Sequence, residues 1–236
     1  MDYLLTEPAI RIVGILAFLF IAYSLWMGRM KAQGLPGGYR NPVLALELVK
    51  SGPDIEQIVK AESGAAATFI KRSTKKDFGF ILVYALSFVA LSLLLAKINV
   101  NYYTKLMGCF AAGCAALAAI FDLAENRGML KAVDGEATDT LADNIRYPSL
   151  AKWALLFIFA LLVGLLLVRR LDSFAIPAAF FLIATLLGLY GVLANFFRPK
   201  YYWAFPAAIT SLGIGMLILA VTLSFWPAKL IASVGR

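Results

Sequence analysis

The chain has 236 residues, of which 61% are hydrophobic and only 15% are charged, and its mean hydropathy is +0.81. About half of the residues in an ordinary soluble domain are apolar, so this composition indicates an integral membrane protein. The formal net charge of +8 does not indicate a nucleic-acid-binding protein, because the basic residues lie between apolar segments rather than in a separate domain.

The sequence contains no histidine. This excludes Ser-His and Cys-His nucleophile pairs, histidine-ligated haem, and metal sites that require imidazole. We therefore identify no cofactor, although carboxylates alone could hold a hard cation. Cys109 and Cys114 lie on opposite sides of one predicted helix, so we expect no disulfide between them.

Six apolar segments have roughly the 20 residues that a helix needs to cross a bilayer. We predict an all-α fold class, a polytopic membrane helix bundle that forms a single membrane domain over residues 1–236. Tyr201, Tyr202 and Trp203 at the start of the last segment, and Trp226 at its end, are typical of the membrane interface. The predicted spans are residues 8–28, 77–96, 104–127, 148–168, 175–197 and 202–226.

Residues 29–76 separate the first two predicted spans and carry helix signals of their own. Asn41-Pro42 predicts a helix start, and Gly52-Pro53-Asp54 ends that helix and begins another. This pattern predicts a cytoplasmic amphipathic helical hairpin, on the membrane surface or against the bundle; a partly ordered linker is the alternative. The apolar stripe of the second helix consists of Ile55, Ile58, Val59, Ala66, Phe69 and Ile70.

Two charged segments flank the predicted spans. Lys71, Arg72, Lys75 and Lys76 precede the second span, where such a cluster orients the helix and predicts contact with anionic lipids. Residues 134–147 form an acidic loop between the third and fourth spans. That loop either docks electrostatically on the basic hairpin of residues 29–76 or is solvated.

The distribution of Lys and Arg predicts the orientation. With both termini outside, the cytoplasmic segments hold 15 of the 22 Lys and Arg residues, and basic residues are retained on the cytoplasmic face. We therefore expect a multi-pass protein of the cell inner (plasma) membrane with large cytoplasmic loops. The expected partners are the lipid bilayer and its anionic lipids, the sequence is compatible with a protein partner in a membrane complex, and no nucleic acid is expected.

The third span carries the most informative polar residues. On a helix, the small residues Ala111, Ala115 and Ala118 share a face with Asp122 and Glu125, so this face should look into the bundle. The predicted topology brings polar residues of four spans together near the cytoplasmic boundary, while the outer half of the bundle carries mainly hydroxyl groups. This predicted polar cluster consists of Tyr23, Ser24, Asp77, Tyr84, Asp122, Glu125, Asn126, Tyr190 and Asn195.

The predicted cluster has two interpretations. Asp122 and Glu125, supported by Asp77, could act as general acid and base or hold a cation. Alternatively these acids pair with basic residues, and Asn126 and Asn195 form interhelical hydrogen bonds. The basic residues considered as partners are Arg40, Arg72, Lys76 and Arg127.

No motif decides between the two interpretations. Asp122 to Asn126 read D-x-x-E-N, but the sequence lacks the repeated aspartate motifs of lipid-alcohol phosphotransferases and prenyltransferases. It also has no H-E-x-x-H, G-x-S-x-G or Walker loop. The leading hypothesis is a lipid-interacting or accessory structural membrane component without turnover. The alternatives are a small membrane enzyme acting on a lipid or isoprenoid, and a small-solute transporter.

A structure can separate these hypotheses. An enzyme should have an open pocket above Asp122 and Glu125, with carboxylates that lack basic partners. A structural component should have the same carboxylates bonded to arginine or lysine. A transporter needs a water-accessible cavity that reaches the outer half of the bundle.

Overall fold

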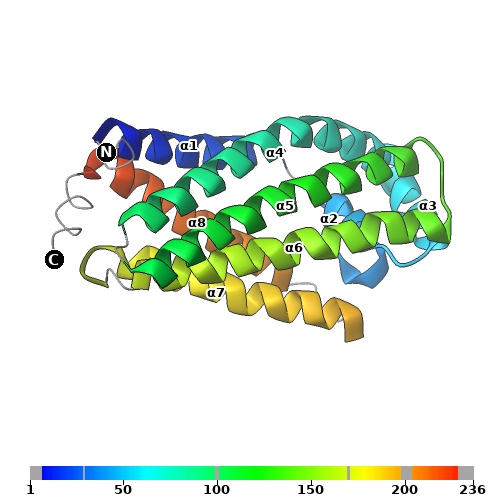
Figure 1. Cartoon of the computed structure of the whole chain (residues 1–236). Coiled ribbons are helices and arrows are strands. Elements are labelled where there is room, and N and C mark those ends of the chain that lie inside the picture. The colour runs from blue at the N-terminus through cyan, green and yellow to red at the C-terminus, as the bar shows by residue number, and fades with distance from the viewer. Residues whose placement is uncertain (1–6, 29, 99–100, 169–170, 198–203, 228–236) are drawn as a thin grey trace.

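The computed structural model describes residues 7–28, 30–98, 101–168, 171–197 and 204–227, without the side chains of residues 171–173 and 194–197. Every regular element in these ranges is helical, which confirms the predicted all-α class (Figure 1). Two 3₁₀ turns, Pro36–Gly38 and Ala61–Gly64, accompany the α-helices. The α-helices are α1 (Glu7–Trp26), α2 (Pro42–Glu47), α3 (Gly52–Lys60), α4 (Ala65–Ile98), α5 (Tyr102–Val133), α6 (Asp139–Val168), α7 (Leu171–Phe197) and α8 (Ala204–Phe225).

Six of the helices in the described residues are long and apolar enough to cross a membrane, which is the number predicted. They form a closed ring, because α1 packs on α4, each helix from α4 to α7 packs on the next, and α8 packs back on α1. Figure 1 shows these helices lying roughly along one axis, with the start of α1 and the end of α8 near one end and α3 at the other. We call these two ends the terminal end and the α2–α3 end.

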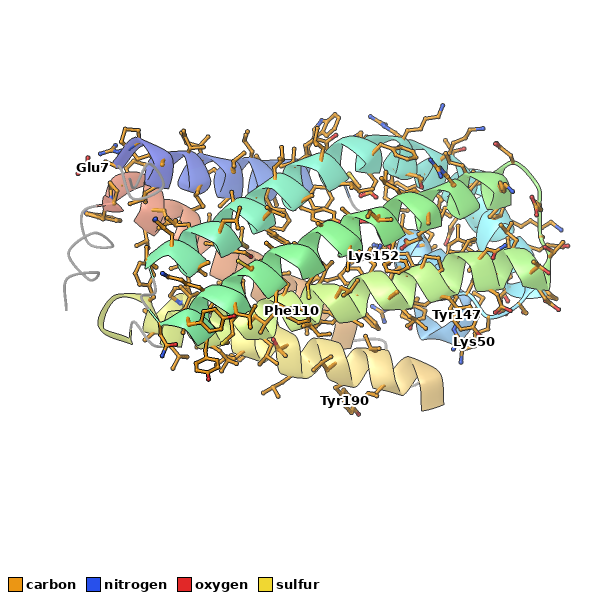
Figure 2. All side chains as sticks on the ribbon, viewed as in Figure 1. Glu7, Lys50, Phe110, Tyr147, Lys152 and Tyr190 are labelled. Carbon is orange, nitrogen blue, oxygen red and sulfur yellow. The ribbon has the colours of Figure 1, made fainter. Side chains whose placement is uncertain are left out.

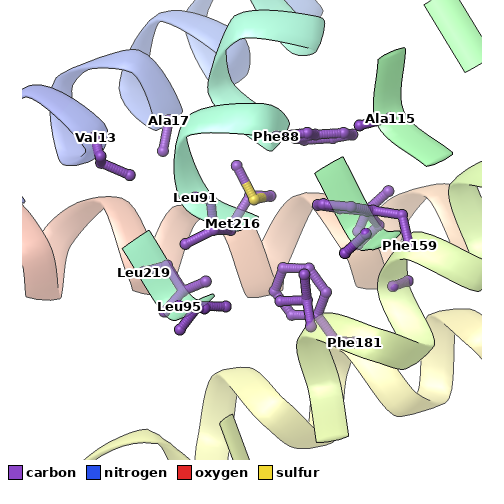
Figure 3. Packing of buried hydrophobic residues seen from close by; sticks show 14 of the residues in the cluster. Val13, Ala17, Phe88, Leu91, Leu95, Ala115, Phe159, Phe181, Met216 and Leu219 are labelled. Atoms are coloured by element: carbon purple, nitrogen blue, oxygen red, sulfur yellow. The ribbon is translucent and has the colours of Figure 1, made fainter. Parts of the chain in front are cut away.

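Large apolar side chains fill the ring from its middle toward the terminal end (Figure 3). Phe88 of α4 stacks on Phe159 of α6 with the ring centroids 4.5 Å apart, and Phe181 of α7 meets Phe159 edge to face. Met216 and Leu219 of α8 belong to the same buried cluster. These buried side chains occupy the interior of the ring in this half.

Glycines allow neighbouring helices of the ring to approach closely. A Cβ atom on Gly108 of α5 would lie 2.5 Å from Cβ of Ala96 in α4 and 2.9 Å from the carbonyl oxygen of Ser92. A Cβ atom on Gly14 of α1 would collide with Ser224 of α8. The small residues therefore lie where backbones meet, as the alanine face of α5 predicted.

The segment that precedes α4 packs on the α2–α3 end of the bundle. Asn41 caps α2 by accepting a hydrogen bond from the Val43 N–H at 2.9 Å, and Pro42 occupies the first turn, as predicted. The apolar face of α2 and α3 then joins side chains of α4, α5 and α6 in a second buried cluster. Its fully buried members include Leu46, Ile55, Ile58, Ile70, Ala142 and Ile145.

Two helices begin earlier than predicted. The second helix of the expected hairpin breaks at the 3₁₀ turn Ala61–Gly64, and α4 then continues from Ala65 through the predicted second span. Likewise α6 begins at Asp139, so most of the predicted acidic loop is helical and Pro148 lies inside the helix. The helix tolerates Pro148 because the residue that loses its hydrogen-bond partner, Asn144, is exposed.

The acidic segment contacts residues of the predicted hairpin, 29–76. The Gly52 N–H donates a hydrogen bond to Asp139 Oδ1 at 2.8 Å, and Lys71 pairs with Asp134 at 2.6 Å. Both members of the second pair are about half exposed, so this contact orients the segments more than it stabilises them.

Candidate functional site

A buried lysine lies at the centre of the polar residues. Lys152 of α6 is 4% exposed, and its Nζ lies 2.8 Å from Glu125 Oε2 and 3.1 Å from Asp122 Oδ1. Glu47 Oε1 lies 3.7 Å from the same nitrogen. Two carboxylates from α5 and one from the short helix α2 therefore surround the ammonium group of Lys152, which is labelled in Figure 2.

Neutral side chains bind the remaining oxygens of Asp122 and Glu47. The Tyr84 hydroxyl donates to Asp122 Oδ2 at 3.0 Å, and the Trp153 indole N–H donates to Glu47 Oε2 at 2.9 Å. A fourth acid, Asp77, accepts a hydrogen bond from the Asn126 side chain at 2.7 Å. We call Glu47, Asp77, Asp122, Glu125 and Lys152 the ion cluster.

The helical repeat places the members of the ion cluster. Asp122, Glu125 and Asn126 fall three and four residues apart on α5, on the face that carries the fully buried Ala118. Glu47 comes from the last turn of α2, and the burial of that helix on the bundle carries its side chain to the ring interior. Lys152 reaches the same point because α6 is already helical well before it.

Glu47 lies outside the predicted spans, and its environment shifts its acidity. Burial raises the pKa of Glu47, while the charge of Lys152 and the hydrogen bond from Trp153 lower it to a lesser extent. The net shift is upward from the ordinary value of 4.5. Folding therefore favours the protonated form of this carboxyl group relative to the unfolded chain.

The ion cluster borders a cavity of about 190 Å³ inside the ring. Helices α1, α2, α4, α5, α6 and α8 all contribute to its wall, which is mostly apolar. A groove of about 570 Å³ adjoins it between α2, the start of α8 and the chain before α2. The cavity and this outer groove share four lining residues, Val43, Glu47, Trp153 and Ile209.

The structure brings together most of the residues predicted as a polar cluster. Asp77, Tyr84, Asp122, Glu125 and Asn126 lie in one hydrogen-bonded network with Lys152 or border it. Both Asp77 and Asp122 line the cavity, so the predicted convergence of α4 and α5 at one level is observed.

Three of the other predicted members lie at the edge of the network or away from it. The Tyr23 hydroxyl donates to the Lys76 carbonyl at 2.9 Å, and Ser24 lines the cavity while donating to its own helix at Phe20. Tyr190 is 42% exposed on the outside of α7, because its neighbours Gly191 and Val192 take the buried face (Figure 2). The Asn195 side chain lies outside the described residues.

The prediction of which basic residues pair with the acids is wrong. Arg40, Arg72 and Arg127 are exposed, and Lys76 donates to the Trp26 carbonyl at 3.2 Å. The lysine that pairs with the acids, Lys152, lies inside the predicted span of residues 148–168, and it belongs to the 15 Lys and Arg residues assigned to the cytoplasmic side. Its position four residues after Pro148, in an otherwise apolar stretch, was the available signal, as was the lone acid Glu47 within an apolar run.

The four basic residues before the second predicted span surround a shallow surface depression with Tyr23, Trp26 and Thr68. Lys76 Nζ lies 3.9 Å from the centre of the Trp26 ring, and Lys71 pairs with Asp134. Arg72 and Lys75 are exposed on the same turns of α4.

The geometry restricts the chemistry of the site. Asp122 and Glu125 are both paired with Lys152 in this arrangement. Among the described residues, no three His, Cys, Asp or Glu side chains are arranged to hold a metal ion. The fold and the site define a ring of six membrane-length helices with a buried ion cluster beside an internal cavity. Comparison with protein-family models, curated proteins and solved structures finds no match to this chain.

Proposed function

We propose that the chain is a multi-pass membrane protein that binds a lipid or similar amphiphile in the cavity, without turning it over. The observation that carries this proposal is the cavity itself, which combines apolar walls with one polar side and opens toward the outer groove. Ligand sites of this kind have mostly hydrophobic linings and a few placed polar groups. The chain then acts as a lipid-interacting or accessory component of its membrane.

The ion pairs support binding rather than catalysis. An enzyme that used Asp122 and Glu125 as acid and base would need one of them unpaired, whereas Lys152 lies within 3.1 Å of both. Transport receives less support as well, because Phe88, Phe159 and Phe181 fill the ring between the cavity and the terminal end. The same pairing also stabilises the packing of α5 on α6.

The distribution of charge supports an orientation. The α2–α3 end carries the basic residues around α4, and 15 of the 22 Lys and Arg residues belong to the segments assigned to that side. We propose that this end faces the cytoplasm in the inner (plasma) membrane, with both termini outside. The depression around Lys71, Arg72, Lys75 and Lys76 then contacts anionic lipid headgroups.

A cavity-filling variant tests the proposal. Val43 lines both the cavity and the outer groove, so Val43→Trp should displace the bound amphiphile. Ile12→Trp places the same bulk on a side chain that is 57% exposed on α1 and serves as the control. The measurement is native mass spectrometry of the purified proteins, with identification of the lipids that remain bound.

We expect the unaltered chain and Ile12→Trp to retain a lipid and Val43→Trp to lose it. Retention of equal lipid by Val43→Trp, or no retained lipid on the unaltered chain, contradicts the proposal. If the purified protein converted a retained lipid to a product, the proposal of binding without turnover would be wrong, and the chain would be an enzyme.

A further inference from the structure

The wall of the cavity carries an excess of acidic groups. Among its described lining residues, Glu47, Asp77 and Asp122 are acidic and Lys152 is the one basic residue. Lys152 also pairs with Glu125 behind the wall, so one ammonium group faces four carboxyl groups in all. When all are ionised the ion cluster bears three uncompensated negative charges, and buried charge of one sign is costly without a counter-charge.

A second and independent feature of the wall is an unsatisfied hydroxyl group. Thr74 is 2% exposed and lines the cavity, and its Oγ1 has no hydrogen-bond partner among the described residues. Buried hydroxyl groups nearly always have a partner. Thr74 lies three residues before Asp77 on α4, so the two side chains share one face of the helix. The wall therefore presents an unused hydroxyl beside a carboxylate.

Aromatic rings line the same cavity. The ring of Phe20 lies 5.5 Å from that of Phe80 and 5.1 Å from that of Phe88, measured between centroids. Tyr84 adds a fourth ring, 5.6 Å from Phe80. Aromatic faces attract cations, most strongly where water is excluded. The same rings provide an apolar surface for a hydrocarbon chain.

We infer that the ligand of this cavity is an amphiphile with a positively charged polar end, an ammonium group that binds beside Asp77 and Thr74. This inference rests on the proposed amphiphile binding and adds its chemical class. An ammonium N–H group can donate to the free hydroxyl oxygen of Thr74 and to the Asp77 carboxylate, while its charge reduces the negative excess of the ion cluster. The chain of the amphiphile then extends along Phe20, Phe80 and Phe88, or toward the outer groove.

The test compares ligands that differ only at the polar end. Dodecylammonium, dodecanol and dodecyl sulfate are added at equal mole fraction to the purified full chain in an uncharged detergent. Binding is measured from the ligand dependence of thermal unfolding. Ethylammonium, which has the same charge without the chain, distinguishes a lipid headgroup from a soluble amine.

We expect dodecylammonium to bind about tenfold tighter than dodecanol, since one charge-assisted hydrogen bond contributes about that factor. Dodecyl sulfate should bind weakest. Two substitutions locate the effect. Asp77→Asn keeps the shape of the side chain and should reduce the preference for the cation at least several-fold, while Asp134→Asn removes an equal charge on the surface and should leave it unchanged.

Thr74→Val gives an independent check if Asp77→Asn does not fold. Valine matches threonine in shape but cannot accept a hydrogen bond, so binding of dodecylammonium should weaken by about threefold. Dodecyltrimethylammonium has no N–H group, and its affinity should not change.

The outcomes separate this inference from the proposed function. Equal binding of dodecylammonium and dodecanol overturns the cationic ligand and leaves amphiphile binding in place. Binding of none of the twelve-carbon ligands overturns both. Ethylammonium binding as tightly as dodecylammonium supports the ammonium site but contradicts a lipid source. Loss of the cation preference in Asp134→Asn overturns the assignment to the cavity.

Discussion

Lys152 is the residue on which the buried acids depend. Its ammonium group lies within 3.7 Å of Glu47, Asp122 and Glu125, and no other basic side chain among the described residues forms an ion pair with them. Both members of each pair are largely buried, so water cannot replace the lysine. Removing one member of a buried pair leaves its partners charged and unpaired, which costs more than the pair contributes when intact.

We therefore expect Lys152→Met to destabilise the protein by about 3–5 kcal/mol, the usual cost of breaking a buried ion pair. Lys71→Met serves as the control, because Lys71 and Asp134 are about half exposed and their pair contributes about 1 kcal/mol or less. The measurement is equilibrium unfolding in detergent, followed by circular dichroism. Equal effects of the two substitutions would show that the acids do not depend on Lys152.

Glu47 predicts a pH dependence whose sign follows from its raised pKa. Burial favours the protonated form in the folded state, so this stabilising contribution is fully present below the ordinary value of 4.5 and is lost as pH rises through the folded-state pKa. Glu47→Gln cannot ionise and keeps an oxygen that can accept from Trp153. The stability of Glu47→Gln relative to the unaltered chain should therefore increase as pH rises above 4.5, by at most about 1.4 kcal/mol per pH unit.

Unfolding of both proteins between pH 4 and pH 8 checks this expectation. A difference in stability that stays constant, or that decreases with rising pH, would mean that the attraction of Lys152 for the Glu47 carboxylate outweighs the cost of burial.

At the scale of the elements, the sequence predicts local helical patterns, but it does not predict the exact helix starts or how the helices pack on one another. The six long helices and the inward face of α5 were predictable, because apolar length and the spacing of Asp122 and Glu125 follow from a local pattern. The pairing of those acids with Lys152 was not predictable, because it depends on how α6 packs on α5. The early start of α6 was not predictable either, because it depends on Thr138, whose hydroxyl accepts from the Leu141 N–H at 3.1 Å, and on tertiary packing that overrides Pro148.

The position of Glu47 could not be predicted either, because it also depends on tertiary packing. A short helix such as α2 is marginal in isolation, so its sequence could not show whether it would lie on a membrane or enter the bundle. The buried cluster with Leu46, Ile58 and Ile145 decides this, and it joins residues far apart in the chain.

The close approach of α4 and α5 gives a prediction with an internal control. Gly108→Ala places a methyl group against Ala96 and the Ser92 carbonyl, and backbone at that distance cannot move aside easily. We expect a loss of about 1–3 kcal/mol from overpacking. Gly113 lies on the same helix with nothing within 4 Å of its Cβ position, so Gly113→Ala should be neutral or stabilise by about 0.5–1 kcal/mol.

Thermal unfolding of the two alanine variants side by side measures the difference. If Gly108→Ala were as stable as Gly113→Ala, α4 and α5 would have room to separate at this point, and the ring would be looser than its packing indicates.

At the scale of the whole molecule, the ring is polar at one end and apolar at the other. The cavity, the outer groove and the basic depression all belong to the α2–α3 half, whereas Phe88, Phe159 and Phe181 fill the middle and other apolar side chains fill the terminal half. In the proposed membrane arrangement, this asymmetry places the cavity and the outer groove near one membrane face. The excess of Lys and Arg assigns that face to the cytoplasm under the proposed orientation.

Cysteine accessibility tests both the crossing of the membrane and its direction. Glu7 and Lys50 are exposed and lie near opposite ends of the molecule (Figure 2). In a chain with Cys109 and Cys114 replaced by alanine, Glu7→Cys should react with a membrane-impermeant maleimide in intact cells. Lys50→Cys should react only after permeabilisation, because the single crossing between them, by α1, places the two residues on opposite sides. Reaction of both in intact cells would contradict a chain that spans the membrane between them, and reaction of Lys50→Cys alone would reverse the orientation. In that reversed case the cavity would open to the outer leaflet, and the bound amphiphile would come from that side.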